Sequence, residues 1–60
     1  MKSRYDPSTK TLTIQGRGLR DYLFVEEEYR VFLYKNGFFL DCSTLYLSTD
    51  FFNFSFRKEK

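Results

Sequence analysis

The chain has 60 residues, so it holds one small domain at most, covering residues 1–60. Hydrophobic residues make up 42% of the sequence and charged residues 30%, a balance that excludes an intrinsically disordered or collagen-like chain. The formal net charge of +2 is too small to identify a nucleic-acid-binding protein by itself.

The first predicted elements are a turn and a strand. Residues 6–9 read Asp-Pro-Ser-Thr, in which the aspartate side chain caps a turn and the proline fixes φ at its second position. After this turn, polar and apolar residues alternate, which places Leu12 and Ile14 on one face of a strand. Gly16-Arg17-Gly18 then ends the strand.

The segment from Leu19 to Tyr34 admits two interpretations. As a helix, the segment places five apolar residues near one stripe, namely Tyr22, Val25, Tyr29, Phe32 and Leu33. As strands, residues 22–25 and 28–35 are separate segments. Asn36-Gly37 would stop a helix, but this pair flanked by aromatic and β-branched residues is also the strongest short-range hairpin signal. We therefore predict strands and keep a helix near residues 19–28 as the alternative.

A two-residue loop at Asn36-Gly37 fixes the register of the predicted hairpin, because Tyr34 then faces Phe39 and Leu33 faces Leu40. One face of this hairpin is aliphatic and suited to a core; it consists of Val31, Leu33, Leu40 and Cys42. The opposite face is aromatic and forms the candidate partner-binding site, which consists of Phe32, Tyr34 and Phe39 with Arg30 beside them.

The last part of the chain predicts a turn at Thr49-Asp50 and an amphipathic strand over residues 51–57. Three phenylalanines share one face of this strand and are assigned to the core: Phe52, Phe54 and Phe56. The predicted fold class is all-β, a small antiparallel meander of five to seven short strands that forms a bent sheet or half-open barrel. An α+β fold with a helix near residues 19–28 is the alternative.

The chemistry available to the chain is narrow. Without histidine, the sequence lacks the commonest general base at neutral pH and the commonest zinc ligand. Residues 26–28 are three glutamates without the spaced Asp and Asn residues of a calcium loop, and Cys42 has no histidine to activate it. Gly16-Arg17-Gly18 is too short for a phosphate-binding loop. We therefore predict a protein that is not an enzyme and holds no metal or cofactor.

Sequence features also bear on location. No apolar run approaches the ~18 residues of a membrane span, and the first residues lack the apolar stretch of a signal peptide. The single cysteine, Cys42, cannot form an internal disulfide, and a reducing compartment is the default for such a chain. The sequence therefore predicts a cytoplasmic protein with no membrane partner.

The function expected from these patterns is protein binding. Large apolar groups on both faces of the predicted hairpin need a cover on the second face, and exposed aromatic patches typically mark protein contacts. We expect a small oligomeric inhibitor or adaptor that binds a larger protein partner and associates with itself. Its size is typical of a phage or mobile-element product that blocks a host protein.

The alternative function is a single-stranded nucleic-acid-binding module. Residues 1–20 and 51–60 are net basic, and aromatic side chains set among basic residues suit unpaired bases. Residues 21–50 are net acidic, however, and would repel phosphate. The sequence therefore predicts nucleic-acid binding weaker than ~10 μM at physiological salt.

Overall fold

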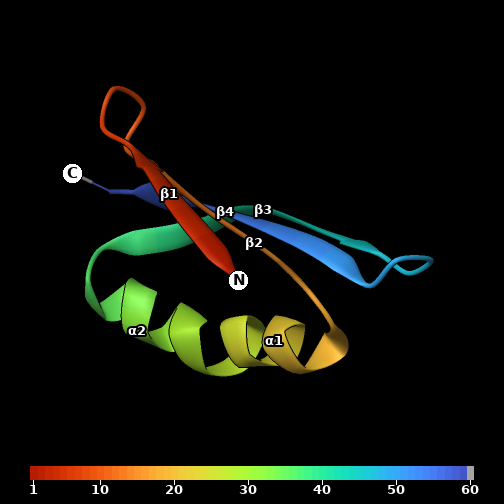
Figure 1. Cartoon of the computed structure of the whole chain (residues 1–60). Helices are drawn as coiled ribbons and strands as arrows, with labels where there is room; N and C mark the ends of the chain where they lie inside the picture. The colour runs from red at the N-terminus through yellow and green to blue at the C-terminus, as the bar shows by residue number, and fades with distance from the viewer. Residues whose placement is uncertain (60) are drawn as a thin grey trace.

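The computed structural model describes residues 1–59, which form an antiparallel sheet with one helix against it (Figure 1). Its strands are β1 (Lys2–Asp6), β2 (Thr11–Arg17), β3 (Phe38–Tyr46) and β4 (Phe51–Lys58). The order across the sheet is β1-β2-β4-β3, so β4 lies between β2 and β3. A 17-residue helix connects β2 to β3 and covers one face of the sheet, and we call the other face the open face.

The fold is therefore α+β, and the prediction of an all-β meander is wrong. Residues 1–59 form four strands rather than five to seven, and the sheet is open rather than a half-open barrel. The strands expected at residues 22–25 and 28–35 are helical. The alternative of an α+β fold gives the right class, although its helix near residues 19–28 extends to Lys35.

The physical reason for this difference lies at Asn36-Gly37, which ends the helix instead of forming a hairpin loop. Asn36 donates from Nδ2 to the Phe32 carbonyl at 2.8 Å, and its backbone N–H donates to the Leu33 carbonyl at 3.0 Å. Gly37 has a φ of 87°, the left-handed conformation that follows many helices. The same dipeptide suits both a tight hairpin and a helix end, so it does not distinguish between them.

The helix changes its hydrogen-bonding pattern in the middle. It consists of α1 (Leu19–Phe24), a π-helical turn, η1 (Val25–Tyr29), and α2 (Arg30–Lys35). In a regular α-helix, residues 25 and 33 would point about 80° apart. The wider π turn reduces this angle, and both Val25 and Leu33 are buried, with 0% and 3% of their surface exposed.

The hydrophobic core fills the space between the helix and the sheet. Its sheet side contains three phenylalanines of β4 and one isoleucine of β2, all nearly inaccessible to solvent: Phe52, Phe54, Phe56 and Ile14. The Tyr22 ring from α1 packs over Phe52 and Phe54 at centroid distances of 5.9 and 5.4 Å. The assignment of these phenylalanines to the core is confirmed, as is the shared face of Leu12 and Ile14.

The register predicted around Asn36-Gly37 is wrong, because only one side of that pair is a strand. Of the expected aliphatic core face, Leu33 is buried and Leu40 is half-buried, whereas Val31 is 50% exposed and Cys42 is exposed. The β3 strand pairs instead with β4, where Leu40 faces Phe56. A bulge follows at Leu40/Cys42 and shifts the rest of the β3 register.

Both predicted turns are confirmed. In the turn between β1 and β2, the Asp6 carboxylate accepts hydrogen bonds from the Ser8 N–H at 3.0 Å and the Ser8 hydroxyl at 2.7 Å. These hydrogen bonds lower the pKa of Asp6, because they favour the charged carboxylate. In the turn between β3 and β4, the Thr49 N–H donates to the Tyr46 carbonyl at 3.2 Å.

The sheet curls strongly at the end near the β1–β2 turn. Tyr5 of β1 and Phe38 of β3 make an edge-to-face contact at a centroid distance of 6.1 Å, although β1 and β3 are the two outer strands. Lys58 of β4 lies over the Phe38 ring at 5.4 Å. The curl closes one end of the core with aromatic side chains from both edges.

Candidate functional site

Two surfaces on opposite sides of the molecule carry the candidate functional residues. The first is the side of the helix turned away from the sheet (Figure 1). We call it the outer helix surface and define it by six exposed residues: Leu23, Phe24, Glu27, Glu28, Val31 and Phe32. The second is the open face of the sheet.

The outer helix surface is apolar to an unusual degree for a surface exposed to solvent. Phe32 keeps 57% of its surface exposed and Phe24 keeps 43%, and Leu23 and Val31 are exposed to a similar extent. The opposite side of the same helix is buried through Val25 and Leu33. Two opposite sides of the helix therefore carry large apolar residues, and the sheet covers only one of them.

Three aromatic rings form a continuous stack along this surface. Phe24 stacks on Tyr29 at 6.2 Å with an interplanar angle of 15°, and Tyr29 stacks on Phe32 at 5.9 Å with an angle of 6°. Phe24 and Tyr29 are five residues apart, the spacing of a π-helical turn, so η1 is what aligns their rings. The rings and Glu28 line a shallow hollow of about 350 Å³.

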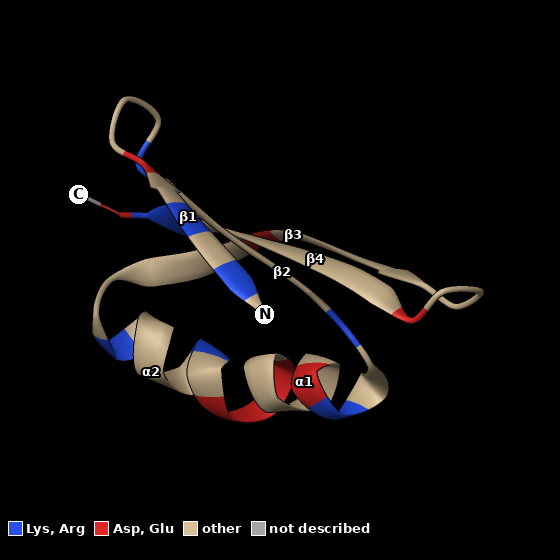
Figure 2. Ribbon diagram, in the orientation of Figure 1, with Lys and Arg blue, Asp and Glu red and all other residues tan. Residues whose placement is uncertain are grey.

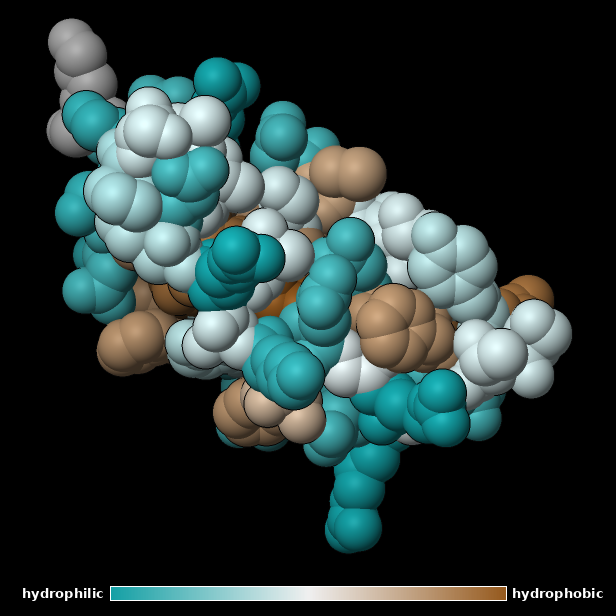
Figure 3. All heavy atoms as spheres, turned by 45° about the horizontal axis from the view of Figure 1, so that its top comes forward, coloured by the Kyte–Doolittle hydropathy of each residue, from teal (hydrophilic) through white to brown (hydrophobic). Residues whose placement is uncertain are grey.

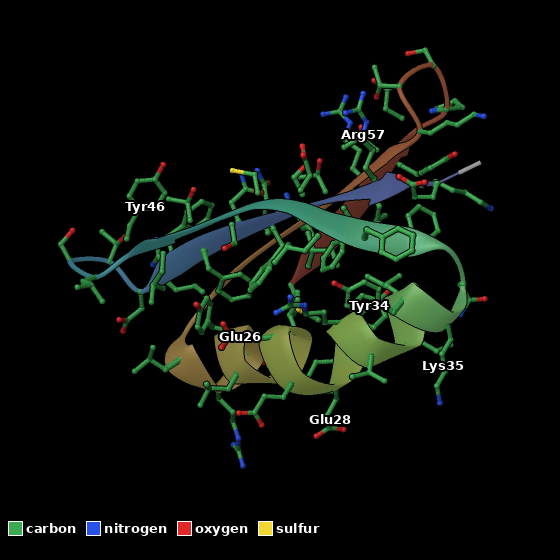
Figure 4. The ribbon with its side chains drawn as sticks, turned by 180° about the vertical axis from the view of Figure 1, so that it is seen from behind. Glu26, Glu28, Tyr34, Lys35, Tyr46 and Arg57 are labelled. Carbon is green, nitrogen blue, oxygen red and sulfur yellow. The ribbon has the colours of Figure 1, made fainter. Side chains whose placement is uncertain are left out.

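Carboxylates divide this apolar surface in two. Glu27 and Glu28 lie between the Leu23-Phe24 pair and the Val31-Phe32 pair, and the Glu28 side chain points away from the sheet in Figure 4. Figure 2 shows the same acidic segment along the underside of the helix. The surface thus alternates from apolar to acidic to apolar along the helix.

Glu26 points the other way, toward the sheet (Figure 4). It accepts a hydrogen bond from the Tyr22 hydroxyl at 3.4 Å. Burial raises the pKa of Tyr22, and the negative charge of Glu26 raises it further. Glu26 is thus occupied within the fold, which leaves Glu27 and Glu28 as the carboxylates facing solvent on this segment.

The structure divides the predicted partner-binding residues between two places. Arg30, Tyr34 and Phe39 lie together: the Arg30 guanidinium is 5.8 Å from the Tyr34 ring, and Tyr34 makes an edge-to-face contact with Phe39 at 5.0 Å. We call these three residues the edge cluster. Phe32 stacks on Tyr29 and belongs to the outer helix surface.

Phe24 and Tyr29, the other two members of the aromatic stack, are not among the predicted partner-binding residues. A strand interpretation of residues 19–35 gave no reason to group Phe24 with Phe32. Their spacing of eight residues places two side chains about 80° apart on a regular α-helix, so the sequence gives no signal for the stack without the π turn.

The open face presents four rows of side chains across the sheet. Two central rows are mostly small and polar: Lys2, Gln15, Asn53 and Thr44, then Arg4, Thr13, Ser55 and Cys42. The row toward the helix N-terminus contains Arg17, Phe51 and Tyr46, and the row at the other end contains Asp6, Thr11, Arg57 and Phe39. In Figure 4, Arg57 and Tyr46 both extend from the side of the sheet away from the helix.

None of residues 1–59 belongs to a helix that is both long and apolar enough to cross a membrane. Within the same residues, no three His, Cys, Asp or Glu side chains gather into a potential metal site.

The comparisons with known proteins add no relative. No protein-family model matches the chain, and neither a curated protein nor a solved structure matches it. The functional argument therefore depends on the two surfaces described above.

Proposed function

We propose that the protein is a non-enzymatic protein-binding module, a small oligomeric inhibitor or adaptor, and that its contact surface is the outer helix surface. The observation that carries this proposal is the exposure of Leu23, Phe24, Val31 and Phe32 on a helix whose other side is already buried. Exposed apolar surface of this kind typically marks a protein contact.

The aromatic stack suits such a contact. Phe24, Tyr29 and Phe32 already stack on one another, and aromatic side chains have only two rotatable χ angles, so little side-chain freedom is lost when a partner covers them. Aromatic side chains are also enriched among the residues that dominate binding energies. The edge cluster of Arg30, Tyr34 and Phe39 lies on the same half of the helix and extends the contact toward β3.

A second copy is the first partner to test, because self-association needs no other component. An isologous dimer places the middle of the shared surface on the two-fold axis. For the outer helix surface, that middle contains Glu27 and Glu28. Repulsion between the carboxylates therefore opposes self-association through this surface, and screening of their charges by salt strengthens it. A partner that places basic groups opposite Glu27 and Glu28 is favoured.

Sedimentation equilibrium over the micromolar range tests the proposal with the double variant Phe24→Ser/Phe32→Ser. The wild-type chain is expected to sediment above its monomer mass of 7.3 kDa, and the variant is expected to sediment as the monomer. Leu47→Ser is the matched control, because Leu47 is a 79% exposed apolar residue in the β3–β4 turn, outside the outer helix surface. This control should associate like the wild type.

Two results would count against the proposal. In the first, the wild-type chain stays a monomer, and the serine substitutions raise its solubility but do not change which other proteins it binds. The apolar surface then has no partner. If Leu47→Ser abolishes association as fully as the double variant does, the contact lies at the β3–β4 turn instead.

A further inference from the structure

A groove with basic walls runs along the β1–β2 side of the open face. Three hollows, of about 710, 470 and 420 Å³, follow one another there. The first two share Arg4 and Thr13, and the second and third share Lys2 and Gln15, so together they form one continuous depression. Its lining includes four basic side chains from three strands: Lys2, Arg4, Arg17 and Arg57.

The acidic residues of the chain lie mostly elsewhere. Glu26, Glu27 and Glu28 are on the helix, on the far side of the sheet from the groove (Figure 2). The acidic side chains that line the groove are Asp6 and Asp41, and both lie in the hollow at the Arg57 end. The part lined by Lys2, Arg4 and Arg17 contains cations without carboxylates, and it complements a polyanion.

The spacing of the cations fits a chain with repeated negative charges. Lys2 and Arg4 are two residues apart on β1, so their side chains leave the same face about 6.6 Å apart. Arg17 lies on β2 and extends this row of cations, opposite Phe51 of β4. A backbone with regularly spaced phosphates can therefore contact several of these residues in succession.

Aromatic and amide groups lie beside the cations. Phe51 and Tyr46 pair across β4 and β3 at a centroid distance of 6.2 Å, and Tyr46 is 54% exposed. Asn53 lies at the centre of the open face, and within the described chain its Oδ1 is buried without a hydrogen-bond partner. The rest of this side of the molecule is mainly hydrophilic (Figure 3).

From this arrangement we infer that the open face binds single-stranded nucleic acid, with phosphates along Lys2, Arg4 and Arg17 and a base stacked on Tyr46 and Phe51. Unpaired bases have exposed rings that stack on such side chains, whereas the bases of a duplex are already stacked. The surface is independent of the outer helix surface and extends the proposed function to a second partner.

Fluorescence anisotropy with a short labelled oligothymidine strand tests the inference. The wild-type chain is expected to bind in the micromolar range at low salt, with a log–log salt slope of about −2 for three contacted phosphates. The double variant Lys2→Gln/Arg4→Gln should bind at least about tenfold more weakly, with a slope about 1.4 shallower, because each lost phosphate contact removes about 0.7. Tyr46→Ala should weaken binding about fivefold or more by removing a stacking surface.

The matched control is Arg20→Gln/Lys35→Gln, which removes the same net charge from the exposed helix and should leave binding nearly unchanged. Circular dichroism confirms that each variant is folded. Equal weakening by the control and the groove variant would overturn the inference, because binding would then follow net charge alone. Tighter binding of a duplex, or of polyglutamate, would also overturn it by identifying another class of partner, as would no detectable binding at low salt.

Discussion

Gly16 is a residue for which the core leaves no room for a side chain. It lies opposite Phe52 in the β2–β4 pair, and a Cβ atom at this position would lie 2.6 Å from the Phe52 Cζ atom. The Phe52 ring is fully buried and cannot move aside without disturbing its neighbours. Gly16→Ala should therefore lower the free energy of unfolding by about 1–3 kcal/mol in urea denaturation.

The neighbouring substitution Gln15→Ala provides the comparison. Gln15 is exposed on the open face, so its loss should cost less than about 1 kcal/mol. Equal destabilisation by the two substitutions would mean that Gly16 is not in contact with the Phe52 ring.

Leu33 and Val31 test which side of the helix faces the core. Leu33→Ala should cost about 2–5 kcal/mol, because it leaves a cavity beside the β4 phenylalanines. Val31→Ala should change the stability by less than about 0.5 kcal/mol, since Val31 is exposed and alanine is the better helix former. Thermal or urea unfolding monitored by circular dichroism measures both, and the reverse order of effects would contradict the orientation of the helix.

The Asp6 carboxyl group offers a pH test of the first turn. Its pKa in the folded chain lies below the usual value because the Ser8 hydroxyl and N–H stabilise the carboxylate. The Asp6 carboxylate therefore contributes fully to stability at pH values above its pKa in the unfolded chain. This contribution is lost as the pH falls through its lower pKa in the folded chain. In an NMR titration, Ser8→Ala should move the pKa of Asp6 up toward its ordinary value. An unchanged pKa would show that the Ser8 hydroxyl does not stabilise the carboxylate.

The conformation of a residue could be predicted from the sequence where neighbouring residues alone determine it. The Asp-Pro-Ser-Thr turn and the alternation of Phe52, Phe54 and Phe56 follow from turn chemistry and strand periodicity, and both could be predicted. The exposure of Cys42 could not, because it depends on the bulge between Leu40 and Cys42, which shifts the register of β3 against β4.

At the level of elements, the helix is the part that the sequence did not determine by itself. Residues 19–35 are rich in aromatic and β-branched side chains, whose intrinsic preference is for strands. Tertiary packing reverses this preference, because Tyr22, Val25 and Leu33 together cover the phenylalanines of β4. The π turn that aligns Val25 with Leu33 has no signature in the sequence, so the aromatic stack of Phe24, Tyr29 and Phe32 could not be predicted either.

The acidic middle of the outer helix surface gives self-association a characteristic salt dependence. Glu27 and Glu28 meet their own copies in an isologous dimer, and salt screens this repulsion with a Debye length of about 10 Å at 0.1 M. The dimer dissociation constant should therefore fall when the ionic strength is raised. Glu27→Gln/Glu28→Gln should associate more tightly than the wild type at low salt and lose most of the salt effect. Dissociation that increases with salt in the wild type would place the contact on oppositely charged groups instead.

At the level of the whole molecule, charge and apolar surface are distributed between opposite sides. The outer helix surface combines exposed apolar residues with Glu27 and Glu28, and the open face carries the basic groove of Lys2, Arg4, Arg17 and Arg57. The sequence did show basic ends and an acidic middle, but only the fold shows that Lys2, Arg4, Arg17 and Arg57 share one face of the sheet and that the helix holds residues 26–28 on the other side. The six residues of the outer helix surface and the four basic residues of the groove are therefore separate sets.

Amide chemical-shift mapping by NMR tests this separation most directly, with two titrations of the same labelled chain. Raising the protein concentration should shift the signals of residues 23–32, and adding oligothymidine should shift those of β1, β2 and Tyr46, with little overlap between the two sets. If both titrations shift the same residues, or if the changes concentrate at the β3–β4 turn, the molecule does not have two independent contact surfaces.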